Sequence, residues 1–409
     1  MSRLRICVLA AVMAAVSLPA MAQQGGKKVC VVTGELNGYP ATLVKIVRYG
    51  EDDRYYGDTI PVRDGRFSYE LEADGSTVYD LTASKEGRGI FAHFFAEEGA
   101  VHIKFNPDSV ADVITSTPLN TDMRRVKAAT DTITKSAFDR LKALERAGRD
   151  YTEPARQILE LAKATKDSRM LEVYNDSLRR LIAANRLVTP EFAAANIAVG
   201  EAYRRQHKVR CRYAVEHPGP VGLYFLQNAA ESGLADTTLV RRAVEDIYAK
   251  KYPAAYATRW LQGWLAGCNT RVGGRYFDFT APDLGGTGHT LSAEIGGKVA
   301  LIDFWASWCG SCRSHSMALI PVYNKYKDRG FTVVGVAREF RDSRAMRKAI
   351  ERDGYPWLNL IELNDRLGLW VKYGVGNAGG ARFLVGRDGR ILAINPDAAQ
   401  VEAILEKEL

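Results

Sequence analysis

The chain has 409 residues, with 56 Lys and Arg against 48 Asp and Glu, a formal net charge of +8 and 46% hydrophobic residues. This length allows two or three domains of roughly 100–200 residues each, with enough apolar side chains for ordinary cores. Six cysteines are too few for a small disulfide-stapled scaffold, and a mean hydropathy of -0.19 argues against a protein with several membrane spans.

Residues 1–22 have the pattern of a cleaved secretory signal peptide. Arg3 and Arg5 form a basic start, an apolar stretch follows, and residues 20–22 match a small-x-small cleavage site. The apolar stretch has about 13 residues, whereas a membrane-spanning helix needs about 20. We therefore expect cleavage after Ala22 and a mature protein in the periplasm or another extracytoplasmic space. No lipobox precedes Cys30, so we expect no lipid anchor.

Residues 28–117 alternate apolar and polar side chains in short runs. Residues 29–32, 43–47, 67–71 and 101–105 are such runs. The pairs Asp64-Gly65 and Asp74-Gly75 between them are typical of hairpin turns. We predict a small all-β domain here.

Residues 118–268 instead place apolar side chains every three or four positions, as at Met123 and Val126. Prolines 154, 190, 218 and 253 mark helix starts or breaks, which predicts an α-helical region of about five or six helices. Residues 121–215 hold 20 Lys and Arg and 12 Asp and Glu. Because these charges alternate at helical spacing, they indicate a solvated face, and we expect no nucleic-acid partner.

Residues 273–409 alternate strand and helix patterns, with the strands at 299–305, 331–337, 382–385 and 391–395 and the helices at 311–328, 343–353 and 398–408. Strand–helix–strand units of this length imply an α/β sheet that contains parallel strands. The expected fold class is therefore multi-domain, with a C-terminal α/β domain preceded by the small all-β domain and the α-helical region.

Two cysteines stand at the start of the first predicted helix of the α/β region. Cys309 and Cys312 are three positions apart and follow an apolar strand. The unpaired amides and the positive dipole end of the helix would stabilise a thiolate at Cys309. Cys312 would face the same side within bonding reach. This spacing indicates reversible dithiol–disulfide exchange.

Two other interpretations of this pair remain. A zinc site needs four ligands, but the sequence has no second Cys-x-x-Cys pair, so we expect neither a metal nor another cofactor. A purely structural disulfide would close too small a loop to stabilise the chain much. We interpret Cys30, Cys211 and Cys268 as buried small apolar residues, although two of them could form a bridge.

The run from Asp303 to Arg313 resembles the thioredoxin superfamily. It is most similar to the exported TlpA/ResA-like thiol-disulfide oxidoreductases, which are grouped with the alkyl hydroperoxide reductase/thiol-specific antioxidant family. Residues 277–284, 326–336 and 386–391 add to this resemblance, which implies a thioredoxin-like fold for 273–409. The preceding part resembles, through weaker motifs, a poorly characterised domain that often precedes such modules in gut Bacteroidetes.

The resemblance also implies roles for single residues. Cys309 matches the attacking thiol, Cys312 the resolving thiol, and Asp303 a buried acid that assists proton transfer at the second sulfur. A carboxyl group under an apolar site should have a raised pKa, although Asp303 could also be a strand-end residue satisfied by the backbone. We expect Trp305 in the core and Trp308 at an exposed rim. The residues implied in client binding are Trp308, Gly310, Ser311, Gly380 and Ala381.

Three positions depart from the family pattern. Gly380 stands where the family has a cis-proline, and because a non-proline cis bond costs about 3 kcal/mol we expect a trans or mobile loop there. His315 replaces a common Glu, and Met317 replaces the proline that kinks the helix. A protonated His315 could favour a thiolate, or His315 could be an exposed helical residue without a role.

The function that we expect is that of an exported enzyme, a thiol-disulfide oxidoreductase that reduces client proteins and is regenerated by a membrane-borne electron donor. One alternative is a thiol peroxidase of the peroxiredoxin type, although residues 302–309 lack the Pro-x-x-x-Thr-x-x-Cys arrangement. The other is a redox-inactive binding module. The N-terminal or helical region is where we would expect two copies of the chain to associate.

Overall fold

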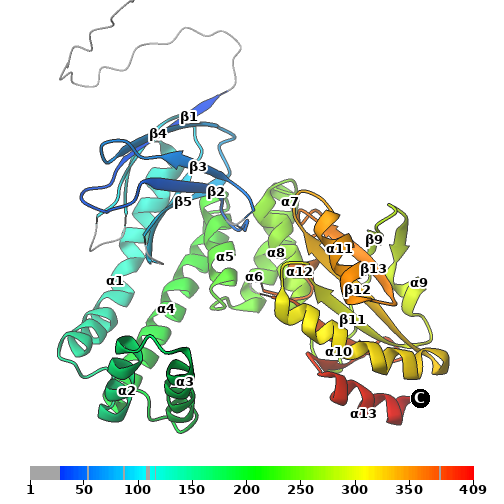
Figure 1. The fold of residues 1–409 in the computed structure, drawn as a ribbon. Coiled ribbons are helices and arrows are strands. Elements are labelled where there is room, and N and C mark those ends of the chain that lie inside the picture. The colour runs from blue at the N-terminus through cyan, green and yellow to red at the C-terminus, as the bar shows by residue number, and fades with distance from the viewer. Residues whose placement is uncertain (1–27, 53–54, 86–87, 107–110, 116, 377–378) are drawn as a thin grey trace, which may run out of the picture.

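The computed structural model describes residues 28–52, 55–85, 88–106, 111–115, 117–376 and 379–409. The expected signal peptide, residues 1–22, lies outside these ranges. Along the chain, a β part in blue is followed by helices in cyan and green and by an α/β part in yellow to red (Figure 1). Within the described ranges, none of the helices combines the length and apolar character that a membrane span requires.

The N-terminal part consists of two sheets that share one core. Its strands are β1 (Val29–Glu35), β2 (Leu43–Arg48), β3 (Asp58–Pro61), β4 (Arg66–Glu72), β5 (Val78–Lys85), β6 (Arg88–Phe95), β7 (Gly99–Lys104) and β8 (Asp112–Thr115). One sheet has the order β4-β1-β7-β8 and the other β3-β2-β5-β6. Val32 and Val101 from the first sheet pack with Leu81 and Phe94 from the second. The β prediction for this part of the chain is confirmed.

The turn predicted at Asp64-Gly65 is present. Both residues have positive φ angles, 52° and 71°, and the flanking residues Arg63 and Arg66 exchange backbone hydrogen bonds of 2.8 and 2.9 Å. Such positive φ angles are typical of a two-residue hairpin turn, but the strands on either side, β3 and β4, belong to different sheets. The connection between β2 and β3 is longer, and its residues Tyr55 and Tyr56 contact the C-terminal part of the chain.

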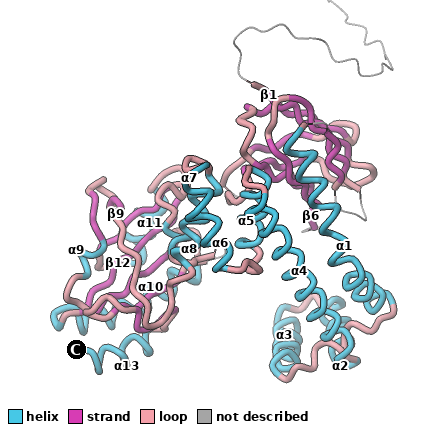
Figure 2. Tube along the Cα trace, turned by 180° about the vertical axis from the view of Figure 1, so that it is seen from behind, coloured by secondary structure: helices cyan, strands magenta, loops and turns pink. Residues whose placement is uncertain are grey.

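The middle of the chain is helical, with α1 (Pro118–Arg146), α2 (Glu153–Ala164), α3 (Ser168–Ala183), α4 (Pro190–Glu216), α5 (Pro220–Glu231), α6 (Thr237–Ala243), a π-helical turn (Val244–Tyr248), α7 (Ala249–Lys251) and α8 (Tyr256–Gly267). The prediction of five or six helices was too low. The segments after α5 are short, and such short helices leave little periodic pattern in the sequence. The long helices α1 and α4 pack side by side, and α2 and α3 lie at the end of this pair that is remote from the strands (Figures 1 and 2).

The helical region begins and breaks where its prolines predicted. Pro154 and Pro190 lie in the first turns of α2 and α4, because the first turn of a helix has no use for the missing proline N–H. Pro218 and Pro253 lie in the connections before α5 and α8.

The helical region also carries exposed ion pairs one turn apart, such as Lys135 with Asp139 at 2.6 Å. Such pairs are typical of a solvated helical face.

The C-terminal part has a five-stranded sheet of order β13-β12-β11-β14-β15. Its elements are β9 (Thr280–Pro282), β10 (Gly288–Thr290), α9 (Leu291–Ile295), β11 (Val299–Trp305), α10 (Gly310–Tyr326), a 3-10 turn (Lys327–Arg329), β12 (Phe331–Glu339), α11 (Arg344–Asp353), β13 (Leu358–Leu363), α12 (Leu369–Lys372), β14 (Ala381–Val385), β15 (Ile391–Ile394) and α13 (Ala398–Glu408). The strands β11, β12 and β13 are parallel, while β14 and β15 are antiparallel to their neighbours.

Each face of this sheet has its own apolar core. The helices α10, α11 and α13 supply one core and α9 and α12 the other. Alternate residues of the buried central strand β11 enter different cores: Leu301 and Trp305 enter the first, and Ile302 and Phe304 the second. Because side chains alternate along a strand, Asp303 lies on the face covered by α10. The strand therefore brings a carboxyl group beneath the helix that carries the two cysteines.

Candidate redox-active site

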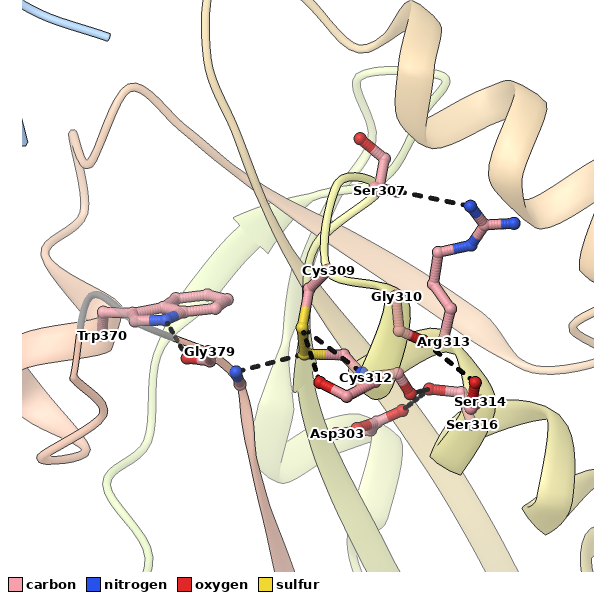
Figure 3. Close-up of a disulfide and its surroundings, with 12 residues drawn as sticks. Asp303, Ser307, Cys309, Gly310, Cys312, Arg313, Ser314, Ser316, Trp370 and Gly379 are labelled. Atoms are coloured by element: carbon pink, nitrogen blue, oxygen red, sulfur yellow. Dashed lines mark hydrogen bonds between the residues drawn. A yellow bond between two sulfur atoms is a disulfide. The ribbon is translucent and has the colours of Figure 1, made fainter. Parts of the chain in front are cut away.

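Cys309 and Cys312 form a disulfide at the N-terminus of α10, with their Cα atoms 5.3 Å apart (Figure 3). Cys309 is the N-cap residue of the helix, and its Sγ accepts the N–H of Cys312 at 3.3 Å. This N–H is one of the donors that a helix leaves unpaired in its first turn. Each cysteine is 7% exposed. The pair is therefore placed where a reduced Cys309 would receive hydrogen-bond and dipole stabilisation.

Asp303 lies on the buried side of the pair. Its side chain is almost completely enclosed, and Ser316 Oγ donates to Oδ2 at 2.6 Å while lying 3.1 Å from the carbonyl oxygen of Cys312 (Figure 3). Burial raises the pKa of Asp303 to about 6, against smaller lowering effects of Ser316 and Arg382. The raised pKa expected from the sequence is present. A group with this pKa can take up or release a proton near neutral pH.

The segment that leads into Cys309 is tied to the end of β12. Glu339 is 3% exposed and accepts both the N–H and the hydroxyl of Ser307 at 2.8 Å. Burial raises the pKa of Glu339, and the two hydrogen bonds from Ser307 oppose that rise. The paired donors hold the backbone two residues before Cys309.

The first turn of α10 is anchored to the end of α11. Arg313 donates two hydrogen bonds of 2.6 Å to the two carboxylate oxygens of Asp353. The Asp353 side chain is 3% exposed, and the guanidinium group lowers its pKa. A two-point contact of this kind fixes orientation as well as distance. It therefore sets the position of the residue that directly follows Cys312.

The loop before β14 contacts the sulfur of Cys312. The Gly380 N–H donates to Cys312 Sγ at 3.2 Å, and Trp370 Nε1 donates to the carbonyl oxygen of Gly379 at 3.4 Å (Figure 3). The peptide bond between Gly379 and Gly380 is trans, one of the two outcomes expected for this departure from the family pattern. Ala381 begins the strand and pairs with Phe304.

The family model described as AhpC/TSA matches residues 272–394. A thiol:disulfide interchange protein DsbE from Allochromatium vinosum is 32% identical over 132 residues, which cover 31% of this chain and 68% of that protein. The chain belongs to the thiol-disulfide oxidoreductases of thioredoxin fold. The N-terminal part of this oxidoreductase matches a domain of unknown function, DUF4369, over residues 30–123.

Further similarities of the oxidoreductase fall in the same segment. A thiol-disulfide oxidoreductase ResA from Bacillus thuringiensis is 25% identical over 122 residues, 30% of this chain and 68% of that protein. The chain spans only about half, 53%, of a DsbE from Pseudomonas fluorescens, with 29% identity. The thioredoxin domain of a thiol-disulfide oxidoreductase from Bacteroides vulgatus has 30% identity and a TM-score of 0.31, and the match covers 34% of this chain and 96% of that structure.

Trp308 differs from its expected position in the oxidoreductase. It is only partly exposed rather than at an open rim, because Tyr55 from the β2–β3 connection lies beside it, with 6.0 Å between ring centroids. Tyr55 also stacks on Phe340, which follows β12, at 3.8 Å. Trp305 is fully buried, as predicted. Gly310 and Ser311 are exposed between the cysteines.

Among the described residues, the three other cysteines of the oxidoreductase, Cys30, Cys211 and Cys268, are free. Cys30 and Cys211 are buried as expected, but Cys268 is exposed, because it follows the last turn of α8, and no bridge joins any of the three. Within the described residues, no group of three or more His, Cys, Asp or Glu is arranged to hold a metal ion. His315 and Met317 both lie on the exposed side of α10.

Sequence reasoning missed several residues around the cysteines, among them Ser316, Glu339 and Tyr55. Ser316 could have been found, because it lies one helical turn after Cys312 and therefore on the same face. Glu339 carried a weaker signal: it ends a strand parallel to the one that leads into the cysteines, and such strand ends meet at one edge of a sheet. Tyr55 is some 250 residues away in sequence, and no local pattern predicts its contact with Trp308.

Proposed function

We propose that this protein is an exported thiol-disulfide oxidoreductase that reduces disulfides in client proteins. The observation that carries the proposal is the Cys309–Cys312 pair at the N-terminus of α10, with the carboxyl group of Asp303 buried beneath it. The helix N-terminus favours a thiolate at Cys309. The carboxyl group supplies a proton acceptor near neutral pH for the second cysteine.

The reaction has two exchange steps. The Cys309 thiolate attacks one sulfur of a client disulfide, forming a mixed disulfide and releasing the other client sulfur as a thiol. Cys312, after giving its proton to Asp303, attacks Cys309, so the bond between Cys309 and the client breaks and the bond between the two cysteines forms. The client leaves reduced, having gained two electrons and two protons. A membrane-borne electron donor then supplies two electrons, and with two protons from solvent the disulfide becomes a dithiol again.

The client chain would lie over the exposed side of the disulfide. Gly310 and Ser311 are exposed there, with Trp308 on one side and the loop of Gly380 and Ala381 on the other. The remaining assignments belong to the same proposal: export through cleavage after Ala22, and division of the mature chain into units 28–117, 118–268 and 273–409. Two copies of the chain would associate through the N-terminal or helical unit.

The test combines activity, potential and trapping. We expect Cys309→Ser to abolish insulin-disulfide reduction, whereas Cys268→Ser, which removes an exposed thiol outside the site, leaves it unchanged. Cys312→Ala should accumulate mixed disulfides, because the resolving thiol is gone. Unchanged insulin reduction in Cys309→Ser, or a strongly oxidising midpoint potential, would contradict the proposal. Rapid peroxide consumption by the dithiol would favour the peroxidase instead.

A further inference from the structure

Gly380 approaches the site so closely that only glycine fits its backbone position. A Cβ atom built on this residue would lie 1.8 Å from the carbonyl oxygen of Phe304 and 3.2 Å from Cys312 Sγ. The first distance is far inside van der Waals contact, and the neighbouring atom is backbone in the buried strand β11. The chain could accept a side chain here only by moving the loop. The glycine therefore allows the backbone to contact the second sulfur.

This contact gives each sulfur a main-chain donor of its own (Figure 3). Cys309 Sγ accepts the N–H of Cys312 at 3.3 Å, and Cys312 Sγ accepts the N–H of Gly380 at 3.2 Å. A proline has no N–H, so the residue that the family has at this position could not make the second bond. The departure from the family pattern thus adds a hydrogen bond at the resolving cysteine.

We propose that the Gly380 amide stabilises the Cys312 thiolate when the pair is reduced. The inference deepens the proposed function, on which it rests for the resolving role of Cys312. Cys312 is 7% exposed, and loss of water disfavours a thiolate. A hydrogen bond to a charged acceptor is roughly twice as strong as one between neutral groups. The amide therefore offsets part of this loss at the sulfur that must attack the mixed disulfide.

The consequence is a faster resolving step at neutral pH. In that step the Cys312 thiolate forms the bond to Cys309 while the bond from Cys309 to the client breaks, and the departing client thiolate takes up a proton. Two effects oppose each other in the rate of this step. A rise of one in the pKa of Cys312 lowers the thiolate fraction about tenfold, but the more basic thiolate is about threefold more nucleophilic. The resolving step would therefore slow by only about threefold.

Two substitutions separate the donor from the steric effect. We would measure alkylation of Cys312 against pH by peptide mass spectrometry in a Cys309→Ser background, with Gly380, Gly380→Ala and Gly380→Pro. Both variants add a Cβ, but only proline removes the N–H. The added Cβ displaces the loop in both variants, so both should raise the apparent pKa of Cys312. We expect a rise of about one, a tenfold smaller thiolate fraction, with Gly380→Pro, and a smaller rise with Gly380→Ala, which keeps the N–H. No rise with proline would overturn the inference.

A measurement without any change at Gly380 covers the case in which these variants do not fold. In the reduced protein, the amide proton of Gly380 should move downfield as Cys312 ionises, and the amide of Gly376 in the same loop should not. An unresponsive Gly380 amide would refute the hydrogen bond directly. This outcome is independent of insulin reduction and client trapping, so failure of the inference and failure of the proposed function can be told apart.

Discussion

The ring of Tyr55 lies parallel to that of Phe340, with 3.8 Å between the centroids and an angle of 7° between the planes. Tyr55 belongs to the connection between β2 and β3, and Phe340 directly follows β12. The same tyrosine lies beside Trp308, the residue before Cys309. The N-terminal sheets are thus joined to the segment that leads into Cys309 by one aromatic cluster.

Removing this stack should loosen both sides of the junction. Stacked aromatic pairs contribute about 0.5–1.5 kcal/mol, so we expect Tyr55→Ala to speed hydrogen exchange in the 306–309 segment by roughly two- to tenfold. Phe340→Ala should have the same effect, and the double variant should add little. Phe91→Ala is the matched control, since Phe91 is 57% exposed on β6. Additive effects of the two substitutions would show that the rings do not act together.

Asp303 should reduce stability at neutral pH. Because burial raises its pKa from 3.8 to about 6, the folded protein binds this proton more tightly than the unfolded chain does. Stability contributed by the protonated group is therefore lost as pH rises from about 4 to 6. We expect Asp303→Asn to stabilise the oxidised protein by up to about 3 kcal/mol at pH 8 and by little at pH 4, in urea unfolding. An equal effect at both pH values would contradict the assignment.

The Arg313–Asp353 pair should change stability with pH in the opposite direction to Asp303. The Arg313 guanidinium group lowers the pKa of Asp353. The stability that Asp353 contributes is therefore present above pH 3.8 and is lost as pH falls through the lowered pKa. Removing one partner of this partly buried pair leaves the other without its two hydrogen bonds, which costs about 1–3 kcal/mol. We expect Asp353→Asn to lower the free energy of unfolding by this amount at pH 8, measured by urea unfolding. Arg313→Lys should not be more stable than the unaltered protein, because lysine cannot bond both carboxylate oxygens in one plane. A neutral Asp353→Asn would show that the ion pair contributes nothing.

The free cysteines should differ in their reactivity in the folded protein. Burial raises the pKa of Cys30 to about 11 and of Cys211 to about 12. Partial burial also raises the pKa of Cys268, but this side chain is exposed. Iodoacetamide should therefore modify Cys268 first, and Cys30 and Cys211 only after unfolding, because access and thiolate fraction together set the reactivity. Peptide mass spectrometry after a short exposure checks this order. Early labelling of Cys30 would show that the β core opens.

The α/β part could be predicted closely because its apolar runs are long and uninterrupted. The limits of β11 and α13 match the expected ranges residue for residue. β13 was missed, because Asn359 and Glu362 interrupt its apolar pattern. Both are buried and bonded in the fold: Asn359 accepts Trp305 Nε1 at 3.0 Å, and Glu362 accepts two N–H groups of the following turn. Polar residues with such tertiary partners leave no trace in a local pattern.

The site was predictable where it depends on short spacing. Cys309, Cys312 and Asp303 lie on a strand–helix unit whose geometry follows from periodicity. The partners that come from elsewhere in the chain were not predictable in this way. Sequence alone marked Gly380 as unusual, but only the packing of β11 against β14 shows that its N–H faces a sulfur.

Cys268 also determines how a gel of this protein should be interpreted. An accessible thiol in an oxidising compartment can pair with the same thiol of a second molecule. A covalent dimer on a non-reducing gel would then report a crosslink beyond α8 rather than a folded interface. Sedimentation of Cys268→Ser under reducing and oxidising conditions is therefore the appropriate way to count subunits.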